Sequence, residues 1–136
     1  MEEPTHILDT REDYTEMVEN QYFANVDGKN IEAVLNCFHP NALFTIQSAF
    51  SSHKGRDTNI KTMFENLFEQ YSRIVHKDFR HVLDIDNECC ASRFSVENVA
   101  NDGSKIRLSN CNFFYFKDDK IQQVFVYMSG GINTLG

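Results

Sequence analysis

The chain has 136 residues, of which 13 are Lys or Arg and 20 are Asp or Glu, giving a formal net charge of −7. This length predicts one domain over residues 1–136, with enough buried surface for a core and a modest cavity. The negative charge and the scattered basic residues argue against nucleic acid or an anionic membrane as the main partner, because both need clustered Lys and Arg. A hydrophobic small molecule or another protein remains.

The N-terminal segment, MEEPTHILDTRED, is acidic and has no apolar run. It therefore predicts neither a secretory signal nor a transit peptide. No stretch elsewhere approaches the roughly 18 uninterrupted apolar residues of a membrane-spanning helix. We expect a soluble, cytoplasmic protein.

The four cysteines, Cys37, Cys89, Cys90 and Cys111, show no CxxC spacing. Since no histidine stands at metal-ligand spacing from them either, we expect no metal site and no cofactor. Cys89 and Cys90 are adjacent in a strand-like run, so they should point to opposite faces as half-buried reduced thiols. A redox role is the alternative.

Helical periodicity predicts three helices in the first part of the chain. Thr10 and Asp13 form a capping-box-like start for a first helix that runs to about residue 26. Asn30 caps a short second helix that ends before Pro40, since the residue before proline is disfavoured in a helix. The third helix begins near Asp57, and its apolar stripe includes Phe64 and continues to residue 75.

Strands dominate the rest of the chain, where the apolar period changes from 3.6 to 2. Candidate strands cover 42–47, 78–86, 89–99, 105–116 and 120–129. The last four predict an antiparallel meander, so helices followed by strands predict an α+β fold with the helices on one face of a curved sheet. The core spans about 10–129, and the glycine-rich tail 130–136 is expected to fray.

Two amides interrupt the apolar face of the strand over 105–116. Its alternation places Leu108, Asn110, Asn112, Phe114 and Phe116 on one face. Burying an amide without a partner costs roughly 1–3 kcal/mol, so these amides must be paired, hydrated or used. The row predicts a ligand pocket that includes Asn110 and Phe114. The alternative is an amide pair satisfied across the sheet.

Three segments, in this order and spacing, resemble the nuclear transport factor two-like superfamily, and within it the SnoaL-like and ketosteroid isomerase-like branch. They are QYFANVDGKNIEAVLNCFHPNALF, KGRDTNIKTMFENLF and NCNFFYFKDDKIQQVFVYM, and the likeness covers about residues 14–128. The resemblance implies a cone in which three helices cover a strongly curved sheet and enclose a pocket, and dimers that pair through the convex side of the sheet. It also implies a cofactor-independent isomerase, cyclase or dehydratase acting on a hydrophobic carbonyl compound.

In ketosteroid isomerases a first-helix tyrosine and a protonated aspartate donate hydrogen bonds to the substrate oxyanion. The resemblance places Tyr22 at the tyrosine position and Asn112 at that of the aspartate, where an amide can donate the same bond. It places Ile46 where the family has its carboxylate base, and Ile46 cannot accept a proton. The resemblance therefore carries over the donors and not the base.

His81 is the candidate replacement base. It is in phase with Phe79 and Leu83, so alternation places its imidazole on the apolar face of a strand. Some dehydratase-like and cyclase-like relatives carry pocket histidines around this strand, which supports a catalytic role by analogy. The alternative is a structural histidine that is hydrogen-bonded to a neighbour. No role is assigned to His76, which lies near the predicted end of an element.

Two functions fit the pattern. The first is an enzyme in which Tyr22 and Asn112 polarise a carbonyl oxygen and His81 moves the proton. The second is a non-catalytic module that holds an apolar ligand or binds a partner. The missing carboxylate base favours the second, whereas the amides favour a pocket that takes a ligand.

We also expect a homodimer through the outer face of the sheet. Alternation assigns to that face Phe113, Tyr115, Val124, Val126 and Met128. Tyr127, in phase with Ile121 and Phe125, faces either the pocket or the interface.

Overall fold

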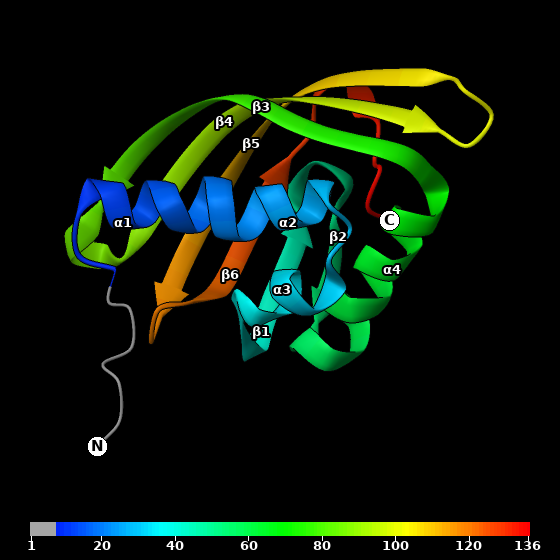
Figure 1. Ribbon diagram of the computed structural model, residues 1–136. Coiled ribbons are helices and arrows are strands. Elements are labelled where there is room, and N and C mark those ends of the chain that lie inside the picture. Colours follow the sequence, from blue (N-terminus) through cyan, green and yellow to red (C-terminus); the bar gives the residue numbers. More distant parts are fainter. Residues whose placement is uncertain (1–7) are drawn as a thin grey trace.

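The computed structural model describes residues 8–136 as an α+β fold, with helices covering one face of a six-stranded sheet that does not close into a barrel (Figure 1). The strands are β1 (Phe38–Ile46), β2 (Ser51–Lys54), β3 (Tyr71–Asp84), β4 (Cys89–Ala100), β5 (Lys105–Lys117) and β6 (Lys120–Tyr127). Their order is β2-β1-β6-β5-β4-β3, and every neighbouring pair is antiparallel except β1 and β6. The α+β prediction and the meander of the last four strands are confirmed.

The first helix consists of three successive parts, α1 (Arg11–Thr15), a π-helical segment (Glu16–Phe23) and α2 (Ala24–Asp27). Its predicted capping box is present, because Thr10 Oγ1 accepts from the Asp13 amide while the Asp13 carboxylate accepts from the Thr10 amide. The π-helical segment carries Tyr22 and Phe23, consecutive residues that are both buried. Such wide turns are frequent at functional sites.

The other helices are α3 (Ile31–Asn36), capped by Asn30, and α4 (Lys61–Gln70), preceded by a π-helical segment (Gly55–Ile60). The third predicted helix therefore ends earlier than expected, at Gln70 instead of residue 75. The β-branched Ile74 and Val75 belong to β3, where they pair with β4. The polar segment after β1 contains a strand that was not among those predicted, β2.

Bulges in two strands decide which side chains face the helices. In β3 the pairing with β4 shifts between Lys77 and Arg80, and Asp78 lies there in the left-handed region with φ of 60°. In β6 the pairing with β5 shifts after Ile121, and Gln122 is the extra residue. One extra residue reverses the alternation of everything beyond it.

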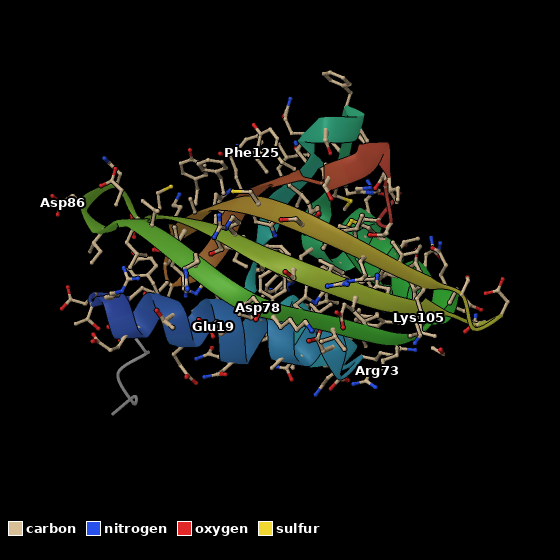
Figure 2. The ribbon with its side chains drawn as sticks, turned by 90° about the horizontal axis from the view of Figure 1, so that it is seen from above. Glu19, Arg73, Asp78, Asp86, Lys105 and Phe125 are labelled. Atoms are coloured by element: carbon tan, nitrogen blue, oxygen red, sulfur yellow. The ribbon has the colours of Figure 1, made fainter. Side chains whose placement is uncertain are left out.

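Because of the bulge in β6, three residues predicted on the outer face of the sheet lie on its inner face. Val124, Val126 and Met128 are buried under the helices, because Asn112 pairs with Val126 and directly paired residues point to the same side. Phe113 and Tyr115 are on the outer face as predicted, together with Tyr127 and the half-buried Phe125. Figure 2 shows Phe125 on the side of the sheet away from the first helix.

The rest of the outer face is basic. The strand register places six basic residues on it: Arg73, Lys77, Arg80, Arg93, Lys105 and Arg107. Arg73 and Lys105 lie at the same end of the sheet (Figure 2). Glu97 pairs with Lys77 at 3.0 Å and with Arg107 at 3.5 Å. The basic residues are thus more clustered than the sequence pattern indicated.

The C-terminal segment folds back toward α4 and β2 (Figure 1). Thr134 is buried and Leu135 packs against the core. Gly136 O accepts hydrogen bonds from Ser51 Oγ at 2.9 Å and from His53 Nε2 at 3.0 Å. These contacts are tertiary, whereas the expectation of fraying rested on local glycine content alone. No helix within residues 8–136 is long and apolar enough to cross a membrane.

Candidate functional site

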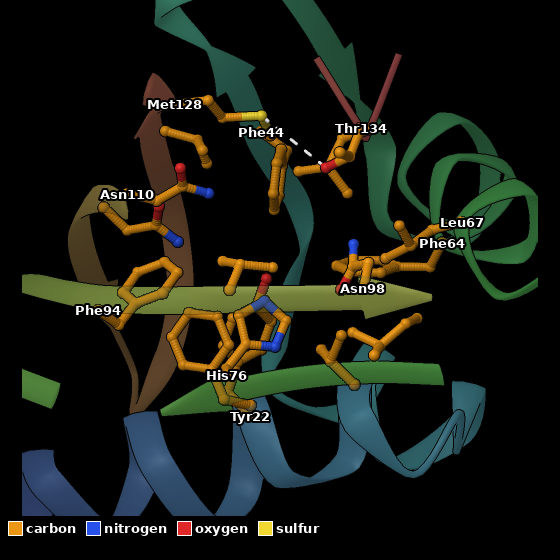
Figure 3. Close-up of a pocket in the computed structure, with 17 residues that line it drawn as sticks. Tyr22, Phe44, Phe64, Leu67, His76, Phe94, Asn98, Asn110, Met128 and Thr134 are labelled. Carbon is orange, nitrogen blue, oxygen red and sulfur yellow. Dashed lines mark hydrogen bonds between the residues drawn. The ribbon is translucent and has the colours of Figure 1, made fainter. Parts of the chain in front are cut away.

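A small cavity lies between the first helix, α4 and the inner face of the sheet (Figure 3). Its aromatic lining consists of Tyr22, Phe23, Phe44, Phe64 and Phe94. About 30 Å³ is open to the centres of water-sized molecules, room for about two waters. The cavity is therefore largely filled by the protein's own side chains.

Three amides give this aromatic cavity a polar wall. Asn98 of β4 and Asn110 and Asn112 of β5 all line it and are buried. The Oδ1 atom of each has no hydrogen-bond partner among the described residues. Since an unpaired buried polar atom costs about 1–3 kcal/mol, the three oxygens point to donors supplied by water or by a ligand.

Tyr22 lines the same cavity. Its ring is enclosed by aromatic neighbours, with ring centroids 4.6 Å from Phe23 and 5.6 Å from Phe114. Burial, with a smaller contribution from the nearby Cys37 sulfur, raises the pKa of Tyr22 well above its ordinary value. The hydroxyl therefore stays protonated at neutral pH and can donate a hydrogen bond.

His76 also lines the cavity, and Asp27 at the end of the first helix orients it. One carboxylate oxygen of Asp27 lies 2.5 Å from His76 Nδ1, and the other accepts the His76 backbone N–H at 2.9 Å. A carboxylate accepts only, so in the neutral imidazole Nδ1 carries the proton and Nε2 has the lone pair. Among residues 8–136 no side chain bonds that Nε2. A pocket imidazole oriented in this way can accept a proton.

Asp27 occupies an unfavourable place for an acid, the last turn of a helix, where the macrodipole favours positive charge. Its two hydrogen bonds to His76 offset that cost and tie the helix to β3. The sequence pattern placed the end of the first helix at about residue 26 and gave no role to Asp27, the next residue. An acid at that position, followed by Gly28, was the available signal.

His81, the predicted base, lies outside the set of residues that line the cavity. Both ring nitrogens are bonded, Nδ1 to Ser92 Oγ at 2.8 Å and Nε2 to Glu19 Oε2 at 2.7 Å. Phe79 stacks on the imidazole of His81 with ring centroids 5.8 Å apart. Phe79 also packs against Phe23, which lines the cavity. The geometry thus matches the structural alternative for His81.

The remaining predicted residues divide into three groups. Phe64 lines the cavity with Tyr22, Asn110 and Asn112. Phe114 and Ile46 are fully buried in the core and do not line it. Tyr127 lies on the outer face, because the bulge in β6 reverses its phase relative to Ile121.

Other lining residues also escaped prediction, for different reasons. Asn98 is in phase with Phe94 and Val96 on its strand, so the same alternation that revealed Asn110 could have found it. Thr134 and Leu135 reach the cavity through tertiary folding of the C-terminal segment. Local sequence patterns do not predict such a contact.

The cysteines stand apart from this chemistry. All four are free thiols, with Cys90 buried and Cys89 half-buried, as expected for neighbours on opposite faces. Burial raises the pKa of Cys37 to about 11, although Lys120 opposes the shift. Cys37 is therefore a thiol at neutral pH. Residues 8–136 contain no group of three or more His, Cys, Asp or Glu side chains placed to hold a metal ion.

Fold and site together define a class, the cone-shaped α+β proteins of nuclear transport factor two-like type with an internal cavity. The family model described as the SnoaL-like domain matches residues 20–124. The chain therefore belongs to the SnoaL-like domain family, and the resemblance carried by the three sequence segments is confirmed. A search of curated proteins finds no match.

Solved structures agree on the fold. The epoxide hydrolase/cyclase-like enzyme SalBIII, with a role in pyran ring formation in salinomycin, superposes with a TM-score of 0.77 at 15% identity, covering 90% of this chain and 95% of that one. A candidate polyketide cyclase from Xanthomonas campestris pv. campestris gives 0.75 at 18% identity, covering 86% and 90%. A candidate isomerase from Bacillus subtilis gives 0.74 at 14% identity, covering 85% of each chain. At these identities the likeness establishes the fold alone.

Proposed function

We propose that this protein catalyses cofactor-independent proton transfer on a hydrophobic carbonyl compound, in an isomerisation, cyclisation or dehydration. The supporting observation is that an oriented imidazole and a protonated tyrosine meet at one aromatic cavity, where His76 Nε2 has no partner among the described residues. The cyclase and isomerase descriptions of the structural neighbours are consistent with this class of reaction.

The roles follow from the chemistry of each group. The substrate carbonyl oxygen accepts a hydrogen bond from the Tyr22 hydroxyl, which stabilises the negative charge that develops on that oxygen. His76 Nε2 removes the proton from the carbon beside the carbonyl, and Asp27 stabilises the imidazolium that forms. Return of the proton to a different carbon completes an isomerisation. Asn98, Asn110 and Asn112 hold hydroxyl or amide donors of the substrate.

This proposal assigns the base to His76 and not to His81, the base expected from the sequence. A general base needs a free lone pair within reach of the substrate, and both nitrogens of His81 are already bonded. His81 then serves as a structural residue that joins the first helix to the sheet.

The test is deuterium exchange at the carbon beside the carbonyl of 2-tetralone, a compact two-ring ketone, followed by NMR in heavy water. We expect the protein to accelerate this exchange and His76→Gln to reduce the acceleration by about a hundredfold or more. His81→Gln is the matched control and should keep it. Loss of exchange in His81→Gln with retention in His76→Gln would reverse the assignment of the base.

The second candidate function, a binding module without catalysis, is favoured by the absence of a carboxylate at Ile46. It predicts that the protein binds a phenol such as 1-naphthol but does not accelerate exchange in 2-tetralone. Fluorescence titration with 1-naphthol beside the exchange assay separates the two functions. Binding without exchange would contradict the catalytic proposal.

A homodimer through the outer face of the sheet belongs to the same proposal. The aromatic residues of the outer face, all exposed except the half-buried Phe125, form two edge-to-face pairs, Phe113 with Tyr127 and Tyr115 with Phe125, each with ring centroids 6.0 Å apart. Exposed apolar patches of this kind mark interfaces. Sedimentation equilibrium at micromolar concentration should give twice 15.8 kDa, and Tyr127→Glu should reduce it to the monomer mass. A wild-type monomer would contradict the dimer.

A further inference from the structure

The C-terminal segment, residues 129–136, fills part of the cavity. Thr134 and Leu135 are among its lining residues, and Thr134 is 7% exposed. Figure 3 shows Thr134 across the cavity from His76, with a dashed line to Met128. That line is the hydrogen bond from Thr134 Oγ1 to Met128 Sδ at 3.9 Å. A thioether is a weak acceptor, so a better acceptor on a ligand would take this hydroxyl easily.

The size of the cavity requires part of its wall to move before a ligand can enter. Pockets for small molecules usually enclose about 300–1,000 Å³, whereas the space here is about 30 Å³. The helices and strands around it are fixed by backbone hydrogen bonds and a continuous core. The segment after β6 is held mainly by side-chain contacts at its far end, so it is the part of the wall that can leave at least cost.

The segment has a hinge at one end and a latch at the other. Gly130 lies in the left-handed region with φ of 70°, between residues with extended backbone at Met128 and Ile132. The latch consists of Ser51 and His53 of β2, whose side chains hold Gly136 O. Both latch residues are half-buried, but their hydrogen bonds to Gly136 O are exposed, so water can replace the two bonds.

We propose that residues 129–136 form a strap that opens at Gly130 to admit the ligand and closes over it, which makes Thr134 and Leu135 ligand-contact residues that contribute to specificity. The inference rests on the proposed function only in that the pocket takes a ligand. It explains why unpaired amides and an oriented histidine surround a space that holds only about two waters.

Two glycines allow a matched test. Gly130, with φ of 70°, and Gly103, with φ of 89° in the turn between β4 and β5, both have positive φ, and a Cβ added at either meets no atom within 4 Å. Gly130→Ala and Gly103→Ala therefore introduce the same kind of backbone strain without a clash. Only Gly130→Ala strains the closed strap.

The readout without ligand is hydrogen–deuterium exchange of the peptide that covers 129–136. We expect exchange there to be about tenfold faster in Gly130→Ala, and unchanged in Gly103→Ala. In stopped-flow mixing, 1-naphthol should associate severalfold faster with Gly130→Ala and also dissociate faster. Exchange in Gly130→Ala that equals that of Gly103→Ala would overturn the strap.

The two readouts separate the strap from the proposed function. If exchange responds as expected and wild-type protein binds neither 1-naphthol nor 2-tetralone, the strap is supported and the proposed function fails. If 1-naphthol binds wild type, and a variant that lacks 130–136 associates with it at the same rate, the strap is overturned while the pocket stands.

Discussion

Two histidines of β3, five residues apart, each bond a carboxylate of the first helix, yet they differ in what they leave free. His76 lines the cavity, and Asp27 bonds its Nδ1 while Nε2 has no partner among the described residues. His81 is bonded at both nitrogens, by Glu19 and Ser92, and its side chain is 5% exposed. An Asp or Glu partner is therefore not enough to identify a histidine as a general base. The second ring nitrogen must also be free of a hydrogen-bond partner, as it is within residues 8–136 in His76 and not in His81.

The bulge in β3 brings both histidines to the helix side of the sheet. In a regular strand, residues five apart point to opposite faces. The register shift between Lys77 and Arg80 adds the residue that reverses this relation. His76 thus lines the cavity, whereas His81 bonds Glu19 earlier in the same helix.

Among the variants that compare the two histidines, the largest expected effect is on the exchange rate, when the carboxylate partner of each histidine is replaced by the corresponding amide. Asp27→Asn should reduce the exchange rate of 2-tetralone by tenfold or more, because an amide can donate to Nδ1 and so favour the tautomer whose Nε2 is protonated. Glu19→Gln, the matched variant in the other cluster, should leave the rate unchanged. Equal losses in both variants would remove the distinction between the two histidines.

The next effect concerns stability, for which replacing His81 should matter more than replacing His76. His81→Leu should lower the free energy of unfolding by about 1–3 kcal/mol, because it leaves the fully buried Ser92 without its main partner. His76→Leu should cost less, since the Asp27 carboxylate is 24% exposed and can be hydrated. Urea denaturation of both variants measures this, and a larger loss in His76→Leu would contradict the structural role of His81.

A smaller effect tests the bulge itself. Asp78→Val should destabilise the fold by about 1–2 kcal/mol, because a β-branched residue is strained at positive φ. Asp78→Gly is the matched control and should change stability little, since glycine adopts this conformation freely. Thermal unfolding compares the two variants, and equal melting temperatures would contradict a positive φ at residue 78.

The smallest change in stability is expected for Asn112→Leu. Its Oδ1 has no partner among the described residues, so replacing the amide should keep stability within about 1 kcal/mol or raise it. Binding of 1-naphthol should weaken. A variant that loses several degrees of melting temperature and still binds 1-naphthol would show that Asn112 is a packing residue.

The sequence predicted those parts of the site that depend on unbroken alternation. Asn110 and Asn112 lie on the inner face because β5 is regular where they pair with β4. His76 was missed because it fell between the predicted end of the third helix at residue 75 and the strand predicted from residue 78, and because a bulge at Asp78 has no strong sequence signal. The same limitation affected Val126 in β6. Local patterns carry periodicity, whereas bulges reflect the fit of one strand against another.

The parallel pair of β1 with β6 has a consequence for how the chain folds. Phe44 of β1 pairs with Val124, near the far end of the described chain, and β1 has no other neighbour except the short β2. A nascent chain therefore carries an unfinished sheet until β6 leaves the ribosome. Contacts this distant in sequence are slow to form. Since Phe44 and Val126 line the cavity from these two strands, the cavity is completed only when this late pairing forms.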